Sequence, residues 1–256
     1  MEGMTLDRDE LARYARHIVL HEIGGAGQLR LKRASVALVG AGGIGSPAIQ
    51  YLAAAGVGRL ILIDDDRVEA SNLQRQTIFR TADIGMPKTA AAARAAAAIN
   101  PHVVIDQRPM RLDDRNAAEL LADAEVVIDG SDSFATRLTV ADTAFAARIP
   151  LVSAAVGQFD GQVAVYRGWE GDKPCYRCLV GDAPSREGGV SCAEDGVLGP
   201  MVGMIGSLAA LEAIRAITGF GTDSAGQLLI ADLLCFRFRT VRLQKDPACR
   251  CTIATS

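Results

Sequence analysis

A glycine-rich turn constrains the fold of this chain more than any other feature. Residues Gly40-Ala41-Gly42-Gly43-Ile44-Gly45 match the pattern G-x-G-x-x-G. They follow the β-branched run 35–39 and open the apolar stretch 43–55, which suits a helix. Glycines here permit positive φ and let the backbone approach a phosphate at a helix N-terminus. A strand, a glycine turn and a helix in this order predict a nucleotide site, although the turn alone does not separate NAD from ATP.

Strand-like and helix-like segments alternate along the chain up to residue 155. Short β-branched runs are separated by longer segments with helical spacing or composition. The expected strands are 35–39, 59–63, 103–107, 125–129 and 151–155, and the expected helices are 43–55, 87–99, 116–122 and 134–147. This alternation predicts an α/β fold of the Rossmann-like kind, with a mainly parallel sheet and helices on both faces.

The pattern changes after residue 155. Strands at 161–166, 227–232 and 236–243 and a helix at 201–217 predict a C-terminal antiparallel portion. The segment 171–199 is rich in Gly, Pro, Asp and Cys and predicts a long functional loop. Since no repeat or linker is visible, we expect a single domain over 1–256, with its nucleotide-binding part at about 30–155 and a second functional part at about 156–256.

A further helix is expected at 9–20, where apolar residues recur at helical spacing and form one face. His17 and His21 lie one turn apart on it. Because no carboxylate pattern surrounds them, a solvated face is favoured over a metal-binding pair.

Composition and charge exclude several classes of protein. Hydrophobic residues make up 49% and charged residues 22%, which suits a packed core. The net charge is −3 and no basic run occurs, so nucleic acid is not an expected partner. The apolar stretch 197–217 is interrupted by Glu212 and Arg215, which favours a buried helix over a membrane span. No signal peptide is visible, and we expect a cytoplasmic protein.

Polar residues after the second strand narrow the choice of nucleotide. Asp64 ends this strand at the distance typical of a carboxylate that binds a ribose, which an NAD(P)-dependent oxidoreductase would also need. Lys88 is placed in the first turn of the helix 87–99, where a cation opposes the helix dipole and an anion is therefore expected. A triphosphate would benefit from both Arg75 and Lys88. The alternative is that the two are ordinary surface cations.

Asp132 follows the fourth strand, and ligands of open α/β sheets bind at the carboxyl ends of strands. It could hold Mg²⁺ that bridges phosphate oxygens. It could also cap the helix that begins at Phe134, a task that Ser133 could perform equally well.

Cysteines form two close pairs, Cys175-x-x-Cys178 and Cys249-x-Cys251. Four thiolates in two pairs suit a tetrahedral structural zinc ion, with free thiols as the alternative. Such a metal would tie the C-terminus to the long loop. Cys235 lies in a strand-like run and is expected to be a small buried hydrophobic residue.

Several segments together resemble the ThiF/MoeB/HesA family, prokaryotic relatives of the ubiquitin-activating enzymes. The similarity runs from about Arg13 to Cys251. The matching segments are Arg13-Tyr14-Ala15-Arg16-His17-Ile18, Gly40-Ala41-Gly42-Gly43-Ile44-Gly45, Ser71-Asn72-Leu73-Gln74-Arg75-Gln76, Pro87-Lys88, Ser131-Asp132-Ser133, Cys175-Tyr176-Arg177-Cys178 and Gly203-Met204-Ile205-Gly206-Ser207.

The resemblance implies a reaction. The C-terminal glycine carboxylate of a small ubiquitin-like sulfur-carrier protein ending in Gly-Gly (MoaD/ThiS type) attacks the α-phosphate of ATP·Mg²⁺. Pyrophosphate leaves and an acyl-adenylate remains, which serves sulfur transfer for molybdopterin or thiamine biosynthesis. The carrier would bind in the part at about 156–256. Since no C-terminal rhodanese-like domain is present, a separate sulfur donor of the rhodanese or cysteine desulfurase type is expected.

The resemblance also implies roles for single residues. Gly40, Gly42, Gly43 and Gly45 would form the nucleotide-binding turn and Asp64 would hold the ribose. Asn72, Arg75 and Lys88 would contact phosphates and Asp132 would hold Mg²⁺. Arg16 would reach the γ-phosphate of the other subunit, which implies a homodimer. Cys192 matches a cysteine that links covalently to the carrier in some relatives, although Glu194 and Asp195 disfavour a thiolate there.

Two departures from the family pattern are visible. Ser131-Asp132-Ser133 stands where Thr-Asp-Asn is usual, and the second cysteine pair is one residue shorter. Two other functions stay open. An NAD(P)-dependent oxidoreductase leaves Arg75, Lys88 and the cysteine pairs without a role, and a non-catalytic scaffold is disfavoured because the matched polar residues are all present.

Overall fold

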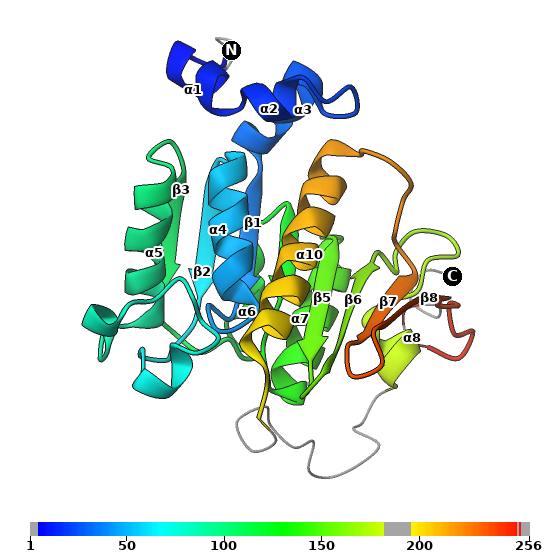
Figure 1. The fold of residues 1–256 in the computed structure, drawn as a ribbon. Helices are drawn as coiled ribbons and strands as arrows, with labels where there is room; N and C mark the ends of the chain where they lie inside the picture. Colours follow the sequence, from blue (N-terminus) through cyan, green and yellow to red (C-terminus); the bar gives the residue numbers. More distant parts are fainter. Residues whose placement is uncertain (1–4, 182–195, 250, 252–256) are drawn as a thin grey trace.

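The computed structural model describes residues 5–181, 196–249 and 251. Its strands form one sheet in the order β3-β2-β1-β4-β5-β6-β7-β8 (Figure 1). Strands β1 to β5 are parallel to their neighbours, and β5 to β8 pair antiparallel. The α/β class with a C-terminal antiparallel portion is therefore confirmed. The strands are β1 (Ser35–Val39), β2 (Arg59–Ile63), β3 (Val104–Arg108), β4 (Val126–Asp129), β5 (Leu151–Val156), β6 (Asp160–Tyr166), β7 (Gln227–Asp232) and β8 (Arg237–Arg242).

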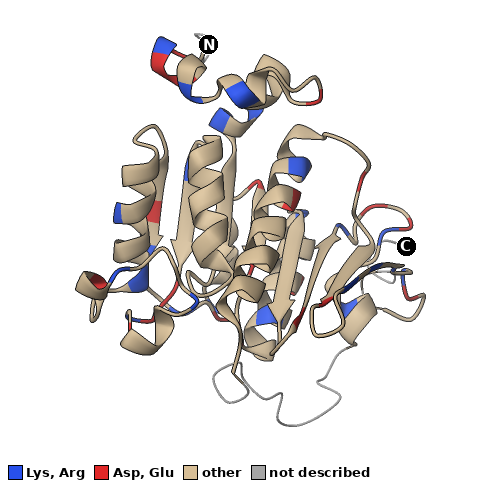
Figure 2. Cartoon of the chain, in the orientation of Figure 1, with Lys and Arg blue, Asp and Glu red and all other residues tan. Residues whose placement is uncertain are grey.

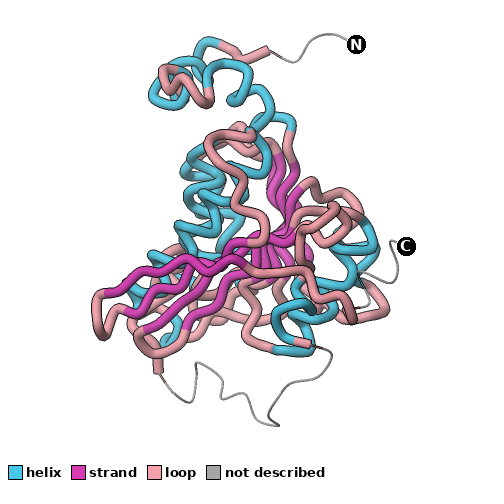
Figure 3. Tube along the Cα trace, turned by 90° about the vertical axis from the view of Figure 1, so that its right-hand side faces the viewer, coloured by secondary structure: helices cyan, strands magenta, loops and turns pink. Residues whose placement is uncertain are grey.

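Helices cover both faces of the sheet because both faces of the parallel strands are apolar. Strands β1 and β5 carry no charged residue (Figure 2). Val36 and Leu38 of β1 belong to one core cluster, whereas Ala37 and Val39 belong to the other. Figure 3 shows the helices on either side of the twisted sheet. The first cluster lies under α4 (Gly45–Ala55), α5 (Lys88–Ile99) and α10 (Gly199–Thr218), and the second under α6 (Ala117–Leu121), α7 (Phe134–Ala147) and α8 (Tyr176–Val180).

Helix α10 is the apolar segment for which a buried position was predicted. It is long and apolar enough to cross a membrane, but half of its most apolar window is buried inside the fold. It packs against α4 and β5. At Gly206 a Cβ atom would lie 2.4 Å from the carbonyl oxygen of Ile44, so only glycine allows this approach to the start of α4. Helix α10 is thus a core helix that supports the glycine turn from behind.

The N-terminal region differs from the prediction. The single helix expected at 9–20 is wrong: α1 (Arg8–Arg13) and α2 (Ala15–Ile18) are separated at Tyr14, and an unpredicted helix, α3 (Gly24–Arg33), follows. Tyr14 is 3% exposed, and its hydroxyl accepts a hydrogen bond of 2.8 Å from Nδ2 of Asn100. This contact between residues far apart in the sequence fixes Tyr14, and the helix is interrupted there although the sequence has regular helical spacing.

The apolar face expected for residues 9–20 is mostly exposed to solvent in the single chain. Leu11 is 49% and Val19 is 74% exposed. His21 is exposed, as predicted, but His17 is half-buried and its Nδ1 lies 3.1 Å from Oε1 of Gln28. The solvated position predicted for His17 is therefore wrong, because α3 folds back and supplies a polar partner.

The C-terminal part holds two further differences. Helix α8 lies inside the segment 171–199 that was predicted as loop, and residues 182–195, with Cys192, lie outside the described residues. Cys235 is exposed, so its predicted burial is wrong. The physical reason is that β7 ends at Asp232 and Cys235 lies in the turn to β8, where its amide donates to Oδ1 of Asp232 (3.1 Å).

A candidate nucleotide site and a four-cysteine cluster

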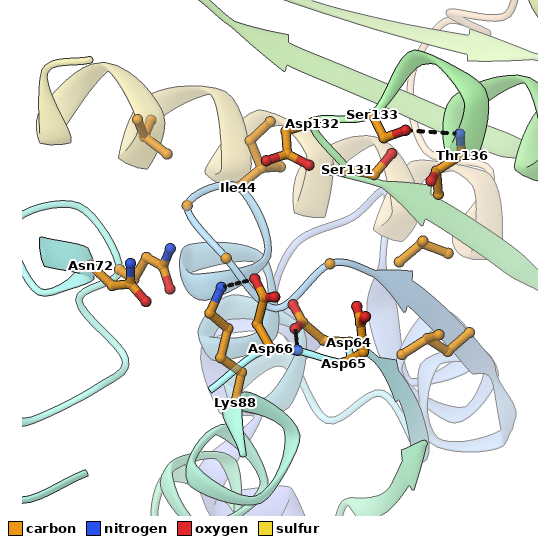
Figure 4. A pocket seen from close by; sticks show the side chains of 18 of the residues that line it. Ile44, Asp64, Asp65, Asp66, Asn72, Lys88, Ser131, Asp132, Ser133 and Thr136 are labelled. Carbon is orange, nitrogen blue, oxygen red and sulfur yellow. Dashed lines mark hydrogen bonds and ion pairs between the residues drawn. The ribbon is translucent and has the colours of Figure 1, made fainter. Parts of the chain in front are cut away.

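A pocket of about 440 Å³ opens at the carboxyl ends of β1, β2 and β4. Its lining comes from segments that are far apart in the sequence and meet because the strands are parallel (Figure 4). Eight predicted site residues line it: Gly40, Gly42, Gly43, Asp64, Asn72, Arg75, Lys88 and Asp132. Gly45 and Arg16 are not among its lining residues.

Backbone geometry explains the glycine turn. Gly40 has a φ of 92°, a conformation that L side chains rarely adopt. At Gly45 a Cβ atom would lie 2.1 Å from the carbonyl oxygen of Gly40, so this glycine closes the turn from behind the pocket. Helix α4 begins at Gly45 without a side-chain cap. The Ser46 N–H already donates to the carbonyl of Gly42 and Pro47 has no N–H, so an anion would be bound by amides of the turn before the helix and by the positive end of the helix dipole.

Asp64 is fixed by the backbone on both of its oxygens. Oδ2 accepts the Ala41 N–H and Oδ1 accepts the Asp66 N–H, each at 2.8 Å. Burial raises the pKa of Asp64, while the nearby charge of Lys88 opposes this shift. The carboxylate is therefore held in place at the end of β2, and it has lone pairs left for a further donor.

Lys88 is 6% exposed and forms an ion pair with Asp66, at 2.7 Å between Nζ and Oδ2. A lysine in the first turn of a helix is unusual, and the sequence therefore predicted that an anion lies beside Lys88. In the structure that anion is the carboxylate of Asp66, whose side chain is 66% exposed. The buried ammonium is thus neutralised by a group that can turn away into solvent.

Asn72 ends a 3₁₀ turn, Ala70–Asn72, beside the pocket, and the N–H of Arg75, three residues further on, donates to the Asn72 carbonyl at 3.0 Å. Oδ1 of Asn72 accepts the Glu69 N–H at 3.1 Å, which leaves its amide nitrogen as the donor side of the group. Nη1 of Arg75 donates to the carbonyl of Ser71 at 3.0 Å, so one arm of the guanidinium is anchored. Both side chains present donors rather than acceptors to this part of the site.

The cap of α7, one of the two roles weighed for Asp132, is formed by Ser133. Ser133 is the N-cap of α7, and its Oγ accepts the Thr136 N–H at 3.4 Å. Asp132 is exposed and makes no hydrogen bond or ion pair with the rest of the described chain. Its carboxylate lies beside Ile44, next to the glycine turn (Figure 4). It is therefore free to bind a cation.

Gln76 and Arg137 are two polar pocket residues to which the sequence assigned no role. Gln76 is 4% exposed, and its Oε1 is buried without a partner in the described part of the chain. It lies in the segment 71–76 that carried the family resemblance, which was the signal that could have found it. Arg137 of α7 also lines the pocket and donates to the carbonyl of Ser131. No motif marked this arginine.

The four predicted cysteines come together behind α7. The sulfur atoms of Cys175 and Cys178 lie 3.8 Å apart, those of Cys175 and Cys249 lie 3.6 Å apart, and those of Cys178 and Cys251 lie 3.5 Å apart. These distances are too long for disulfides, and they match the edges of about 3.8 Å expected for four sulfurs around zinc. The C-x-C pair therefore leaves enough room for this geometry.

The chemistry of the cluster also fits a cation. Burial raises the pKa of the Cys175 thiol and raises that of Cys249 to about 11. Without a cation such thiols stay protonated at neutral pH, whereas a bound metal ion removes their protons. Four cysteine sulfurs within 4.8 Å of one another, three of them from buried residues, form a cluster that suits a zinc ion.

The fold and the pocket define a Rossmann-like α/β protein with an anion-binding turn and a separate four-cysteine cluster. The chain belongs to the ThiF family, whose profile matches residues 14–251. It is 46% identical over 251 residues to a sulfur carrier protein adenylyltransferase of Thermus thermophilus, covering 96% of this chain and 92% of that one. It is 42% identical over 247 residues to a molybdopterin-synthase adenylyltransferase of Escherichia coli K12, with 95% and 97% covered.

Solved structures show the same fold at lower identity. A crystal structure of Escherichia coli MccB with ATP has a TM-score of 0.81 at 24% identity, covering 94% of this chain and 74% of that one. A structure of PaaA has a TM-score of 0.79 at 25% identity, with 96% and 77% covered. The alternative of an NAD(P)-dependent oxidoreductase finds no support among these relatives.

Proposed function

We propose that this protein uses ATP to adenylylate the C-terminal glycine of a small ubiquitin-like sulfur-carrier protein. Relatives that are 42–46% identical over at least 95% of the chain are named as sulfur carrier protein or molybdopterin-synthase adenylyltransferases. One observation of the structure carries the proposal: Arg75, Lys88 and Asp132 line one pocket with the glycine turn. Molybdopterin or thiamine biosynthesis is the pathway that we propose for the carrier.

In this proposal the pocket binds ATP. N–H groups of the turn 40–45 would donate hydrogen bonds to phosphate oxygens, and Asp64 would hold the ribose. Asn72, Arg75 and Lys88 would bind the phosphates, since their donors face the pocket. Lys88 would exchange Asp66 for a phosphate, a step that requires only the exposed carboxylate to turn away.

Asp132 would hold Mg²⁺, which would neutralise phosphate charge when bound. The ionised carboxylate of the carrier attacks the α-phosphorus, an oxygen–phosphorus bond forms, and the bond to the β-phosphate oxygen breaks. Pyrophosphate leaves with the electron pair. No general base is required, because a C-terminal carboxylate is ionised at neutral pH. Arg75 and Lys88 would stabilise the charge that develops on the leaving group.

Arg16 would act in the pocket of a second subunit. Within its own chain Arg16 belongs to the exposed α2, at the edge of the sheet opposite to the pocket (Figure 1). The exposed apolar residues Leu11, Val19 and, on α4, Tyr51 (58% exposed) offer a surface that a second copy could cover. These observations support a homodimer in which each subunit completes the other's site.

The carrier would bind to the part at about 156–256, and the nucleotide to the part at about 30–155 of the same domain. Phe159 lies at the same end of the sheet as the pocket, and so does the β7–β8 turn with Leu234 and Phe236. The two segments are joined by a hydrogen bond of 2.9 Å from the Leu233 N–H to the Phe159 carbonyl. Leu234 is 74% and Phe236 is 83% exposed. Strand β8 adds Arg237, Arg239 and Arg242, which would suit an acidic carrier surface (Figure 2).

The cysteine cluster would bind a structural zinc ion, which suits the reducing cytoplasm. A separate protein would supply sulfur. Cys192, the proposed covalent link to the carrier, lies outside the described residues.

The test combines the protein with ATP, Mg²⁺ and candidate carriers that end in Gly-Gly. Release of pyrophosphate and an AMP adduct on the carrier, detected by mass spectrometry, are expected. Tight binding of NADH, together with no release of pyrophosphate from ATP in the presence of any carrier, would overturn the proposal. A carrier lacking its last glycine is the matched control.

A further inference from the structure

The loop that carries Asp132 is held through the residue before it. The amide and the Oγ of Ser131 donate to Oδ1 of Asp129, at 3.0 and 2.7 Å. On its other side, the carbonyl of Ser131 accepts a hydrogen bond from the guanidinium of Arg137. Every polar group of Ser131 is therefore engaged, and Asp132 follows directly with a carboxylate that has no such contact.

Asp129 explains why an arginine is needed here. This aspartate is 1% exposed at the end of β4, and its Oδ2 is buried without a hydrogen-bond partner in the described residues. A buried carboxylate is costly unless positive charge lies near it. Asp129 and Arg137 meet at Ser131, whose amide and hydroxyl donate to the carboxylate and whose carbonyl accepts from the guanidinium.

The segment between Cys175 and Cys178 connects the cysteines to α7. Tyr176 packs its ring edge-on against Tyr166, with 5.6 Å between the ring centroids. The neighbouring residue, Arg177, forms a two-pronged ion pair with Asp142 at 2.6 and 2.7 Å.

Asp142 lies on α7, the helix that begins directly after the Asp132 loop and also carries Arg137. The segment between the first pair of cysteines is thus tied by an ion pair to the helix that holds the Asp132 loop.

We propose that Arg137 is a positioning residue that fixes the Asp132 loop, and that the ion pair of Arg177 with Asp142 transmits the rigidity of the cysteine cluster to α7, the helix that carries Arg137. The arginine acts on Asp132 through Ser131 and needs no contact with the substrate. Its effect on Mg²⁺ use rests on the proposed function, whereas its effect on the loop does not.

The first test measures hydrogen exchange of the amides in residues 130–136 of the ligand-free protein. We expect Arg137→Ala to speed their exchange about tenfold, the effect of losing one charge-assisted hydrogen bond, and Arg137→Lys to restore part of the protection. Asp142→Asn keeps the shape of the side chain but removes its charge, and it should speed exchange by a smaller factor while bound zinc, measured by elemental analysis, is retained. Arg59→Ala is the control, since Arg59 is also ion-paired but lies at the opposite edge of the sheet.

The second test is kinetic. We expect Arg137→Ala to raise the Mg²⁺ concentration for half-maximal adenylylation about tenfold, with Arg137→Lys in between. Unchanged exchange at 130–136 in Arg137→Ala, or loss of zinc from Asp142→Asn, would overturn the proposal. If Arg137→Ala does not fold, Arg137→Lys and Asp142→Asn provide the same readouts. A wild-type protein without adenylylation activity would refute the proposed function alone, because the exchange test remains.

Discussion

The nucleotide pocket and the cysteine cluster are organised in opposite ways. The pocket is fixed by the chain itself: the backbone closes the glycine turn, Asp64 is held by two amides, and Lys88 is neutralised by Asp66. The cluster brings together Cys175 and Cys249, which are 74 residues apart, with thiols whose pKa is raised by burial. The nucleotide pocket can keep its structure without a ligand, whereas the cysteine cluster is stabilised only when a metal ion replaces the protons of its thiols.

The two sites therefore respond differently to change. In the pocket a lost side chain should weaken catalysis with little effect on the fold. In the cluster a lost ligand should loosen the C-terminal part of the chain. The next experiments test this distinction.

The largest effect is expected from Lys88→Ala. Removal of one charged donor from a leaving-group site typically lowers the rate by about 100- to 1,000-fold. The rate of pyrophosphate release in the presence of carrier measures this loss, and the thermal midpoint should change little because Asp66 returns to solvent. Arg94→Ala, on the same helix with a side chain 55% exposed, is the control. A loss below tenfold would show that Lys88 does not bind a phosphate.

Removal of metal should have the next largest effect. A strong chelator, or Cys251→Ser, should lower the thermal midpoint by several degrees, since binding free energy at such sites is folding free energy. We expect hydrogen exchange to rise in 168–181 and 244–249 but not in β1 or α4. Cys235→Ser is the control, because this exposed cysteine lies outside the cluster. An equal loss of protection in α4 would show that the two sites are not organised separately.

The parallel half of the fold could be predicted because its signals are local. Apolar runs, the glycine turn and the alanine-rich helix each specify their own element. Ala91, Ala92 and Ala96 of α5 are fully buried, as close packing of small side chains requires. The predicted pocket residues meet because parallel strands present their carboxyl ends at one edge.

The remaining features depend on contacts that no local pattern contains. Tyr14 interrupts a regular helical spacing because Asn100 holds its hydroxyl. The anion beside Lys88 was expected to be a ligand, but Asp66 of the chain itself occupies that place. Arg137 acts on the loop before its own helix, and its role becomes visible only when Asp129 is seen to be buried.

The pair of Lys88 and Asp66 gives the third prediction. If Asp66 competes with phosphate for Lys88, Asp66→Asn should tighten ATP binding by about fivefold. This factor corresponds to an ion-pair free energy of about 1 kcal/mol. Titration calorimetry without carrier measures this change. Asp65→Asn removes the same charge one residue away, in a side chain that also lines the pocket. Equal tightening by both variants would indicate general charge repulsion rather than competition for Lys88.

The smallest effect concerns pH. In the metal-free protein, burial raises the pKa of Cys249 from 9.0 to about 11. The folded state then holds the thiol proton more tightly than the unfolded state, so this contribution to stability is complete below pH 9 and is lost as the pH rises toward 11. Urea unfolding of chelated protein at several pH values should show this fall. The zinc-loaded protein should lack it, because its thiols are already deprotonated, and Cys249→Ser should remove it from the metal-free protein. A fall of the same size in all three samples would assign the effect to groups outside the cluster.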